Sequence, residues 1–141
     1  MKETLESLEQ RRLELIRGIG GVGDFRRGII SVNYRKCGKR NCACAQKGHR
    51  GHGPQYLCNT TVAGKSRAAN LRLGPELEKA EREVGSCRRF NELMKEFVDV
   101  NEKICQLRPV REIGSADELD ALKKTLQRRF GRKLNRKSGG R

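Results

Sequence analysis

Three cysteines and one histidine within sixteen residues constrain the fold of this chain more than any other feature. The spacing is Cys-x4-Cys-x-Cys-x7-His, no carboxylate interrupts it, and the residues are Cys37, Cys42, Cys44 and His52. Thiolate sulfur and imidazole nitrogen are the ligands that Zn²⁺ prefers, in a tetrahedral shell of four. A metal held in this way would cross-link a region too small to bury much apolar surface. We therefore expect a structural Zn²⁺ site.

The sequence leaves alternatives for the fourth ligand and for the identity of the ion. His49 and Cys58 compete with His52 for the fourth position, and iron competes with zinc. The C-x2-C pair of zinc ribbons and fingers is absent, so the assignment depends on ligand density and on basic neighbours, which favour thiolates. Four protein ligands leave no open position, so the ion would be structural rather than catalytic.

No segment resembles a targeting or membrane-spanning sequence. Residues 1–6 lack the apolar core of a signal peptide, and no apolar run approaches the roughly 20 residues that cross a bilayer. We therefore expect a cytoplasmic protein without membrane contacts, nucleoid-associated if it binds DNA. In a reducing cytosol, clustered cysteines favour metal over disulfides. Cys87 and Cys105 lie outside the cluster, in a helical pattern, and are predicted to be buried thiols.

Positive charge is concentrated in two blocks. The net charge is +15, yet residues 25–75 hold eleven basic and no acidic residues, and residues 121–141 hold nine basic and again no acidic ones. The remaining segments sum to −5. A solvated surface usually mixes both signs, so two acid-free blocks indicate a protein that binds a polyanion, most often nucleic acid.

The hydrophobic pattern predicts helices around a small group of strands. Residues 2–17 read as an amphipathic helix that ends in a glycine-rich joint. β-Branched and aromatic residues predict strands at 26–34, 55–62 and 66–73, with a turn at the glycine between the last two. An apolar stripe predicts a helix over 76–107. Ser115 begins a last helix, with disorder expected after Gly131.

These elements predict an α+β fold: a small three-stranded antiparallel sheet with a zinc loop, braced by a long helix, plus N- and C-terminal helices. The expected domains are a helix and joint at 1–24, a basic zinc-loop β-domain at 25–75, the long helix at 76–108, and a helix with a basic tail at 109–141. Since 35% of residues are hydrophobic and 4% aromatic, the core must be modest.

Basic side chains in both blocks are candidate contacts to nucleic acid. Those of the cysteine loop suit phosphates, those of the hairpin suit phosphates or bases, and those of the tail would add sequence-independent affinity. Because aromatics are sparse, a stacking platform for single strands is disfavoured. Basic loops and tails contact the backbone of structured RNA equally well, so RNA stays an alternative, with DNA favoured. The candidates are Arg35, Lys36, Lys39, Arg40, Lys47 and Arg50 at the loop, Lys65, Arg67 and Arg72 at the hairpin, and Arg128, Arg129, Arg132 and Lys133 at the tail.

The sequence indicates a non-catalytic protein. The basic block lacks the carboxylates of a two-metal nuclease, and the acids elsewhere lie in mixed-charge helical patterns. Only two histidines are present to act as general bases, and one of them is expected to be a metal ligand. We expect a zinc-stabilised DNA-binding accessory or regulatory factor. The alternatives are an RNA-binding factor, and an assembly subunit that uses the long helix to bind a protein partner or form a homodimer.

One segment resembles a small family of uncharacterised bacterial and archaeal proteins. Residues 27–45 read RGIISVNYRKCGKRNCACA and residues 52–56 read HGPQY. The family pattern is R-G-S-L-x-x-x-Y-x-x-C-G-K-x-x-C-x-C-A, then H-G-P, and Cys37, Cys42, Cys44 and His52 match its four conspicuous positions. The resemblance covers residues 26–100 and implies a compact metal loop and an association with mobile-element genes, as in transposition, but no established activity. The chain departs from the pattern at positions 29–30, where Ser-Leu is usual, and at position 57, where an aromatic is common.

Overall fold

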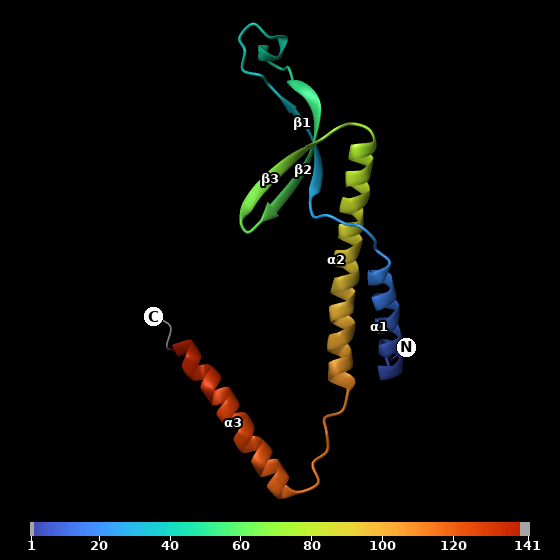
Figure 1. The fold of residues 1–141 in the computed structure, drawn as a ribbon, viewed down its shortest axis with the longest axis vertical. Coiled ribbons are helices and arrows are strands. Elements are labelled where there is room, and N and C mark those ends of the chain that lie inside the picture. Colours follow the sequence, from blue (N-terminus) through green and yellow to red (C-terminus); the bar gives the residue numbers. More distant parts are fainter. Residues whose placement is uncertain (1, 139–141) are drawn as a thin grey trace. The chain divides into compact units, whose positions relative to one another are not determined.

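The computed structural model describes residues 2–138, with side chains described through residue 132 (Figure 1). Its elements are α1 (Leu5–Gly20), β1 (Ile29–Arg35), the short 3-10 helix η1 (Ala43–Ala45), β2 (His52–Val62), β3 (Lys65–Leu71), α2 (Pro75–Leu107) and α3 (Ala116–Ser138). The chain divides into two compact units, Met1–Leu107 and Arg108–Arg141. The predicted α+β fold is confirmed, with its three-stranded antiparallel sheet, Cys/His loop and long helix.

α1 begins at a capping box and ends later than the sequence predicts. The Ser7 N–H donates to the Thr4 hydroxyl at 3.2 Å, and the Thr4 N–H donates to the Ser7 hydroxyl at 3.1 Å. The helix continues through Gly18 to Gly20, so the predicted end at residue 17 is wrong. An added Cβ on Gly18 would lie 3.6 Å from Leu93 of α2. Packing against α2 therefore supports a last turn that the glycines alone disfavour.

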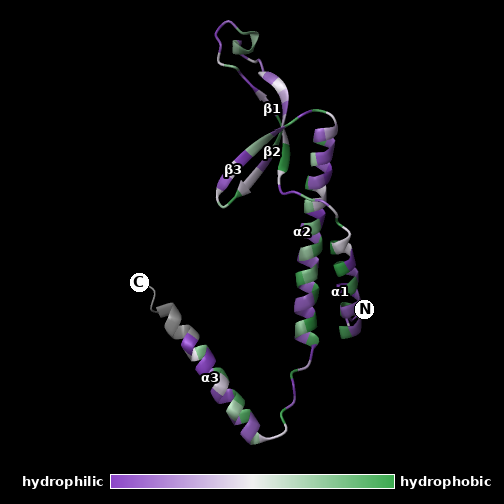
Figure 2. Ribbon diagram, in the orientation of Figure 1, coloured by the Kyte–Doolittle hydropathy of each residue, from purple (hydrophilic) through white to green (hydrophobic). Residues whose placement is uncertain are grey.

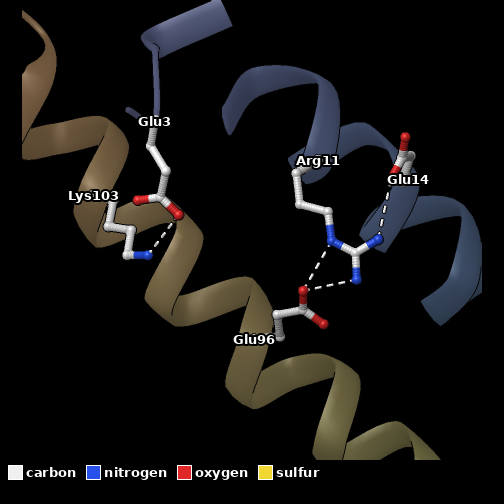
Figure 3. A network of polar contacts seen from close by, with 5 residues as sticks. All are labelled: Glu3, Arg11, Glu14, Glu96 and Lys103. Atoms are coloured by element: carbon white, nitrogen blue, oxygen red, sulfur yellow. Dashed lines mark hydrogen bonds and ion pairs between the residues drawn. The ribbon is translucent and has the colours of Figure 1, made fainter. Parts of the chain in front are cut away.

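α1 and the C-terminal half of α2 pack antiparallel around one apolar core. Two ion pairs border it: Lys103 with Glu3 at 2.9 Å, and Arg11 with Glu96 at 2.7 Å (Figure 3). These side chains are about half exposed, so each pair contributes at most about 1 kcal/mol. Burial of the apolar stripe is the larger stabilising contribution. The buried side chains are Leu8, Leu15, Val100 and Ile104.

The N-terminal half of α2 braces the sheet through a second core. The segment before β1 is held to the same helix: the Phe25 ring stacks on Phe90 with 4.6 Å between centroids. The Arg26 N–H donates to the Glu83 carbonyl at 3.2 Å, and the Arg26 guanidinium pairs with the Glu83 carboxylate at 2.7 Å. α2 is therefore the common support of α1 and the sheet. The core residues are Cys58, Leu71, Ala80 and Val84.

The two cysteines of α2 differ in their environment. Cys87 is buried, as predicted, whereas Cys105 is exposed, so the prediction for Cys105 is wrong. Ile104 is 3% exposed and occupies the buried stripe at this level of the helix. The next residue lies roughly 100° further around the helix axis, which turns Cys105 towards solvent.

The sheet has the order β1-β2-β3, and its last two strands form a tight hairpin. Val62 pairs with Lys65, so only Ala63 and Gly64 connect the strands, both with positive φ (+52° and +76°). Such a two-residue turn matches the twist of paired strands. Because successive side chains alternate between faces, one face packs on α2 and the other consists of the intervening residues.

The second unit contains α3. The Glu118 N–H donates to the Ser115 hydroxyl at 3.2 Å, as the predicted cap requires. The helix then runs to Ser138, so the disorder predicted after Gly131 is wrong for residues 132–138, and residues 139–141 lie outside the described part. Good helix formers such as arginine, lysine and leucine explain the extension. Apolar and polar residues are interspersed along the coloured part of α3 (Figure 2). In the described part of the chain, no helix has the length and apolarity needed to span a bilayer.

Candidate metal centre

The loop that carries the Cys/His cluster lies at the end of the sheet where β1 and β2 stop pairing (Figure 1). His52 is the first paired residue of β2, and Cys37 follows the end of β1 by two positions. The connecting loop, residues 36–51, folds back through η1, whose N-cap residue is Cys42 and whose buried residue is Cys44. Strand pairing and one helical turn therefore bring the four side chains together.

The ligand atoms are spaced as a metal shell requires. All four lie within 4.8 Å of one another. The Sγ atoms of Cys37 and Cys44 are 3.4 Å apart, and Sγ of Cys42 is 3.2 Å from Nε2 of His52. A tetrahedral ion with bonds of about 2.3 Å separates its sulfur ligands by roughly 3.8 Å. All cysteines are free, and 3.4 Å is far longer than a disulfide. Geometry and donor chemistry fit a metal ion.

Gly51 and Gly53 let His52 approach β1. Gly51 has φ +99°, and a Cβ there would lie 2.6 Å from the carbonyl carbon of Arg35. Gly53 has φ +144°, and a Cβ there would lie 2.8 Å from the carbonyl oxygen of Asn33. Only glycine combines this torsional freedom with the absence of a Cβ. The Gly-His-Gly sequence therefore holds the imidazole close to the end of β1.

The loop has little besides the cluster to stabilise it. Within residues 36–51, all of which the structure describes, only Cys44 and Gly51 are buried. The backbone hydrogen bonds inside the loop are local, such as Ala45 N–H to the Cys42 carbonyl at 3.0 Å. One buried side chain cannot offset the conformational entropy of so long a segment. Bonds to a metal ion would supply the missing stabilisation.

Without an ion, the four groups perturb one another. Hydrogen bonds from the Lys39 backbone and from Cys44 and His52 lower the pKa of Cys37 to about 6. The Cys37 N–H lowers the pKa of Cys44, but burial and the thiols of Cys37 and Cys42 outweigh it and raise that pKa overall. Hydrogen bonds to Cys37 and Cys42 raise the pKa of His52. Thiolates this close repel one another, and a divalent cation at their centre would remove the repulsion.

Neither alternative fourth ligand lies in the cluster. Cys58 is 4% exposed and belongs to the core between the sheet and α2. Nδ1 of His49 accepts a hydrogen bond from the Gly51 N–H at 2.9 Å, which closes the turn before β2. The structure therefore places His52, rather than His49 or Cys58, with the three cysteines.

The predicted contact residues of the loop all lie at the surface. Nζ of Lys36 donates to the Gln46 carbonyl at 3.5 Å, and the Arg50 guanidinium lies 4.4 Å from the centre of the Tyr34 ring. Cation–π contact of this kind orients the side chain without neutralising it. Since residues 25–75 contain no acid, the loop supplies no counter-charge of its own. The exposed cations are Arg35, Lys36, Lys39, Arg40, Lys47 and Arg50.

The other predicted contacts whose side chains the structure describes are also exposed, and among them Arg72 is paired. Lys65 and Arg67 lie on β3. The Arg72 guanidinium pairs with the Glu76 carboxylate at 3.3 Å, and the Arg72 N–H donates to the same carboxylate at 2.9 Å. Arg72 therefore holds a side chain of the first turn of α2. The side chain of Lys133 lies outside the described part. On α3, a hollow is lined by Thr125, Arg128, Arg129 and Arg132.

Sequence reasoning missed the surface roles of Arg27 and Tyr34. Arg27 and Arg67 line one hollow at the hairpin end of the sheet. The acid-free block contains residue 27, so charge was a usable signal. Which arginine faces solvent was not deducible, because the pairing of Arg26 with Glu83 depends on the packing of α2.

Comparison with known proteins identifies one family. The model of a family described as Domain of unknown function (DUF6788) matches residues 2–82, more than half of the chain. The matched region contains α1, the complete sheet with the Cys/His loop, and the start of α2. No curated protein and no solved structure matches the chain.

Proposed function

The chain belongs to the family described as Domain of unknown function (DUF6788), and we propose from its residues that it is a non-catalytic nucleic-acid-binding protein. Its basic surface would be folded around a structural Zn²⁺ ion, and its role would be that of a DNA-binding accessory or regulatory factor. The loop 36–51 carries the proposal, because it combines the three cysteines that meet His52 with five exposed cations. A link to mobile elements stays an expectation from the sequence resemblance.

The donor set supports zinc as the ion. Cys37, Cys42, Cys44 and His52 would complete a tetrahedral shell and leave no open coordination position. Such an ion holds a fold together and takes no part in a reaction. Three thiolates and a neutral imidazole around Zn²⁺ carry a net charge of about −1, which the neighbouring lysines and arginines would offset.

The distribution of charge supports a polyanionic partner. Residues 25–75 hold eleven basic and no acidic residues. Two carboxylates of α2 contact this segment: Glu83 pairs with Arg26, and Glu76 pairs with Arg72. The cations of the loop have no such partner among the described residues, and they remain in solvent. Phosphates of a nucleic acid would supply the counter-charge.

The lack of acid–base pairs supports a non-catalytic role. His52 lies in the cluster, and Nδ1 of His49 accepts a hydrogen bond from the backbone. No carboxylate lies in residues 25–75 to act with either of them. General acid–base chemistry needs a positioned group that can exchange a proton with a substrate, and both imidazoles of this surface already have partners within the chain.

The test measures metal content and nucleic-acid binding on the same samples. Wild type and the Cys42→Ser/Cys44→Ser variant are analysed by plasma mass spectrometry, and by fluorescence anisotropy with duplex DNA and RNA. We expect one zinc ion per wild-type chain, none in the variant, and weaker binding by the variant, with DNA preferred. Cys58→Ser is the matched control, because this buried cysteine lies outside the cluster. Wild type that contains no metal as isolated, together with a double variant that binds nucleic acid as tightly as wild type, would contradict the proposal.

The salt dependence of nucleic-acid affinity distinguishes a loss of phosphate contacts from a loss of folded structure. Lys39→Ala/Arg40→Ala should reduce the slope of log K against log salt by about 2, because each phosphate contact contributes about 0.9. The control is Lys95→Ala on the exposed surface of α2, which should leave the slope unchanged. Equal slopes for wild type and the double variant would remove the loop from the interface.

Exposed apolar side chains favour a second candidate, an assembly subunit. Leu13 and Ile16 of α1 are each 49% exposed, and Val98 of α2 is 48% exposed. Val98 also borders a hollow lined by Phe97 and Cys105. Exposed apolar side chains on a pair of packed helices can bind a protein partner or a second copy. Sedimentation of nuclease-treated protein tests the homodimer: a stable dimer supports it, and a monomer at high concentration refutes it.

A further inference from the structure

The face of the sheet opposite α2 is polar and carries no charge. Strand register places residues 29, 31, 33, 55, 57, 59, 61, 66, 68 and 70 on it, alternating with the residues that pack on α2. Although 35% of the chain is charged, none of these positions holds a charged residue. We call it the amide face, after Asn33, Gln55, Asn59 and Asn70.

Most of these amides are free to bind a partner. Asn33, Gln55 and Asn70 are exposed, and no side-chain hydrogen bond within the described residues holds them. Asn59 is partly used, since its Nδ2 donates to the Ser31 hydroxyl at 2.7 Å. Exposed sheet surfaces usually carry charges that prevent association with other chains. An uncharged face of free amides is instead suited to directional hydrogen bonds.

We propose that the amide face reads base edges in the major groove of duplex DNA. This inference rests on the proposed nucleic-acid binding and names the surface that selects sequence. Asn and Gln amides donate and accept at once, as the N6 and N7 atoms of adenine require. Ile29, 69% exposed, and Leu57 lie on the same face and suit the thymine methyl group.

The charges around the amide face complement DNA. The metal loop lies at one end of the sheet (Figure 1) and holds five exposed cations. At the hairpin end, Arg27 precedes β1, and Lys65 and Arg67 border the amide face from positions of β3 that alternate with its own. A hollow of about 500 Å³ joins Arg27 and Arg67 to Asn59 and Thr61. Cations therefore flank an uncharged centre. This is the arrangement expected when phosphates are held at the borders and bases are read between them.

The dimensions favour the DNA major groove. Three strands about 4.8 Å apart span roughly 10 Å between the outer backbones. The major groove of B-DNA is about 12 Å wide and admits a two-stranded β-ribbon, and the outer backbones of this sheet lie within that width. The major groove of A-form RNA is too deep and narrow for side chains to read its base edges. A sheet that reads bases in a duplex groove therefore selects DNA.

The test separates base reading from general binding. Zinc-loaded wild type selects ligands from a pool of duplex DNA with a randomised centre, and from an RNA pool of the same design. The variant Asn33→Ala/Gln55→Ala/Asn70→Ala and its three single variants are then compared on the selected duplex and on a scrambled duplex. Asn91→Ala, an exposed amide on α2, is the matched control. Circular dichroism and zinc content establish that each variant is folded.

We expect wild type to enrich one duplex sequence. The triple variant should bind the selected and the scrambled duplex with equal affinity, and that affinity should match the affinity of wild type for the scrambled duplex. Each lost base contact should reduce selectivity by about 5- to 150-fold. Each single variant should show part of that loss, and Asn91→Ala none. Three results would overturn the base-reading face. The variants could keep the sequence selectivity of wild type, wild type could bind DNA without enriching any sequence, or wild type could enrich sequences from the RNA pool alone. In those cases general nucleic-acid binding stands, whereas a wild type that binds no nucleic acid overturns both proposals.

Discussion

Gly51→Ala tests whether the backbone beside His52 builds the metal centre. The added Cβ would lie 2.6 Å, 2.8 Å and 2.9 Å from the carbonyl carbon, oxygen and nitrogen of Arg35. These are backbone atoms at the end of β1, so no side-chain rotation relieves the overlap. The alanine can be accommodated only if the end of β1 separates from the residue before His52, which moves the imidazole away from the cysteines.

Gly48→Ala is a matched control for the backbone torsion. Gly48 has φ +88°, close to the +99° of Gly51, but an added Cβ there meets nothing within 4 Å. Both variants should suffer the torsional strain of a side chain at positive φ, roughly 1–2 kcal/mol. Only Gly51→Ala adds overlap with packed atoms, which costs about 1–3 kcal/mol. The two variants should therefore differ in zinc affinity by about 5- to 150-fold.

The assay is competition with a chromophoric zinc chelator at constant pH. Strain is present in the metal-bound loop and relieved when the metal-free loop relaxes, so it is measured as lost affinity. Circular dichroism checks that α1 and α2 are unchanged. Equal zinc affinities of the two alanine variants would refute the reasoning, because the contact with Arg35 would then have no effect on the cluster.

Three further predictions concern the cluster, the core and the ion pairs. Cys44→Ser should abolish stoichiometric zinc, whereas Cys58→Ser should retain it in metal analysis, because only Cys44 lies in the cluster. Leu15→Ala should reduce the free energy of unfolding in urea by about 2–5 kcal/mol, since this side chain is 1% exposed, and a loss below about 1 kcal/mol would contradict the core. The Lys79 ammonium lowers the pKa of Glu83 in the folded protein, so this carboxylate stabilises the fold above about pH 4.5 and the contribution is lost as pH falls through the lowered pKa. Zinc-free wild type should therefore lose thermal stability below pH 5 more steeply than Glu83→Gln, and parallel curves would exclude the effect.

Local patterns made much of the fold predictable. The apolar stripe of α2 was readable because buried positions such as Ala80 and Val84 recur at helical spacing. The start of α3 was readable because Ser115 and Glu118 form a cap within four residues. The cluster was recognisable for a similar reason, since the chemistry of thiol and imidazole ligands is a property of the residue types.

Predictions failed where packing overrode local preference. α1 continues past Gly18 because that glycine packs against Leu93, which lies far along the chain. Cys105 is exposed although it is apolar, because Ile104 occupies the buried position at that level of α2. In each case the outcome depends on a neighbour on another element or on the rotation of a helix about its axis, and local spacing leaves both open.

The sequence alone determined the ligand chemistry, the charge blocks and the order of the elements, because these depend on residue type and on spacing within one element. Only the tertiary structure decided that His52 joins the cysteines and that Cys58 enters the core. Pairing of β1 with β2 sets both outcomes: it places His52 opposite the end of β1, and it turns Cys58 towards α2. The amide face likewise exists only once three strands are in register, because its residues come from separate segments that strand pairing brings onto one surface.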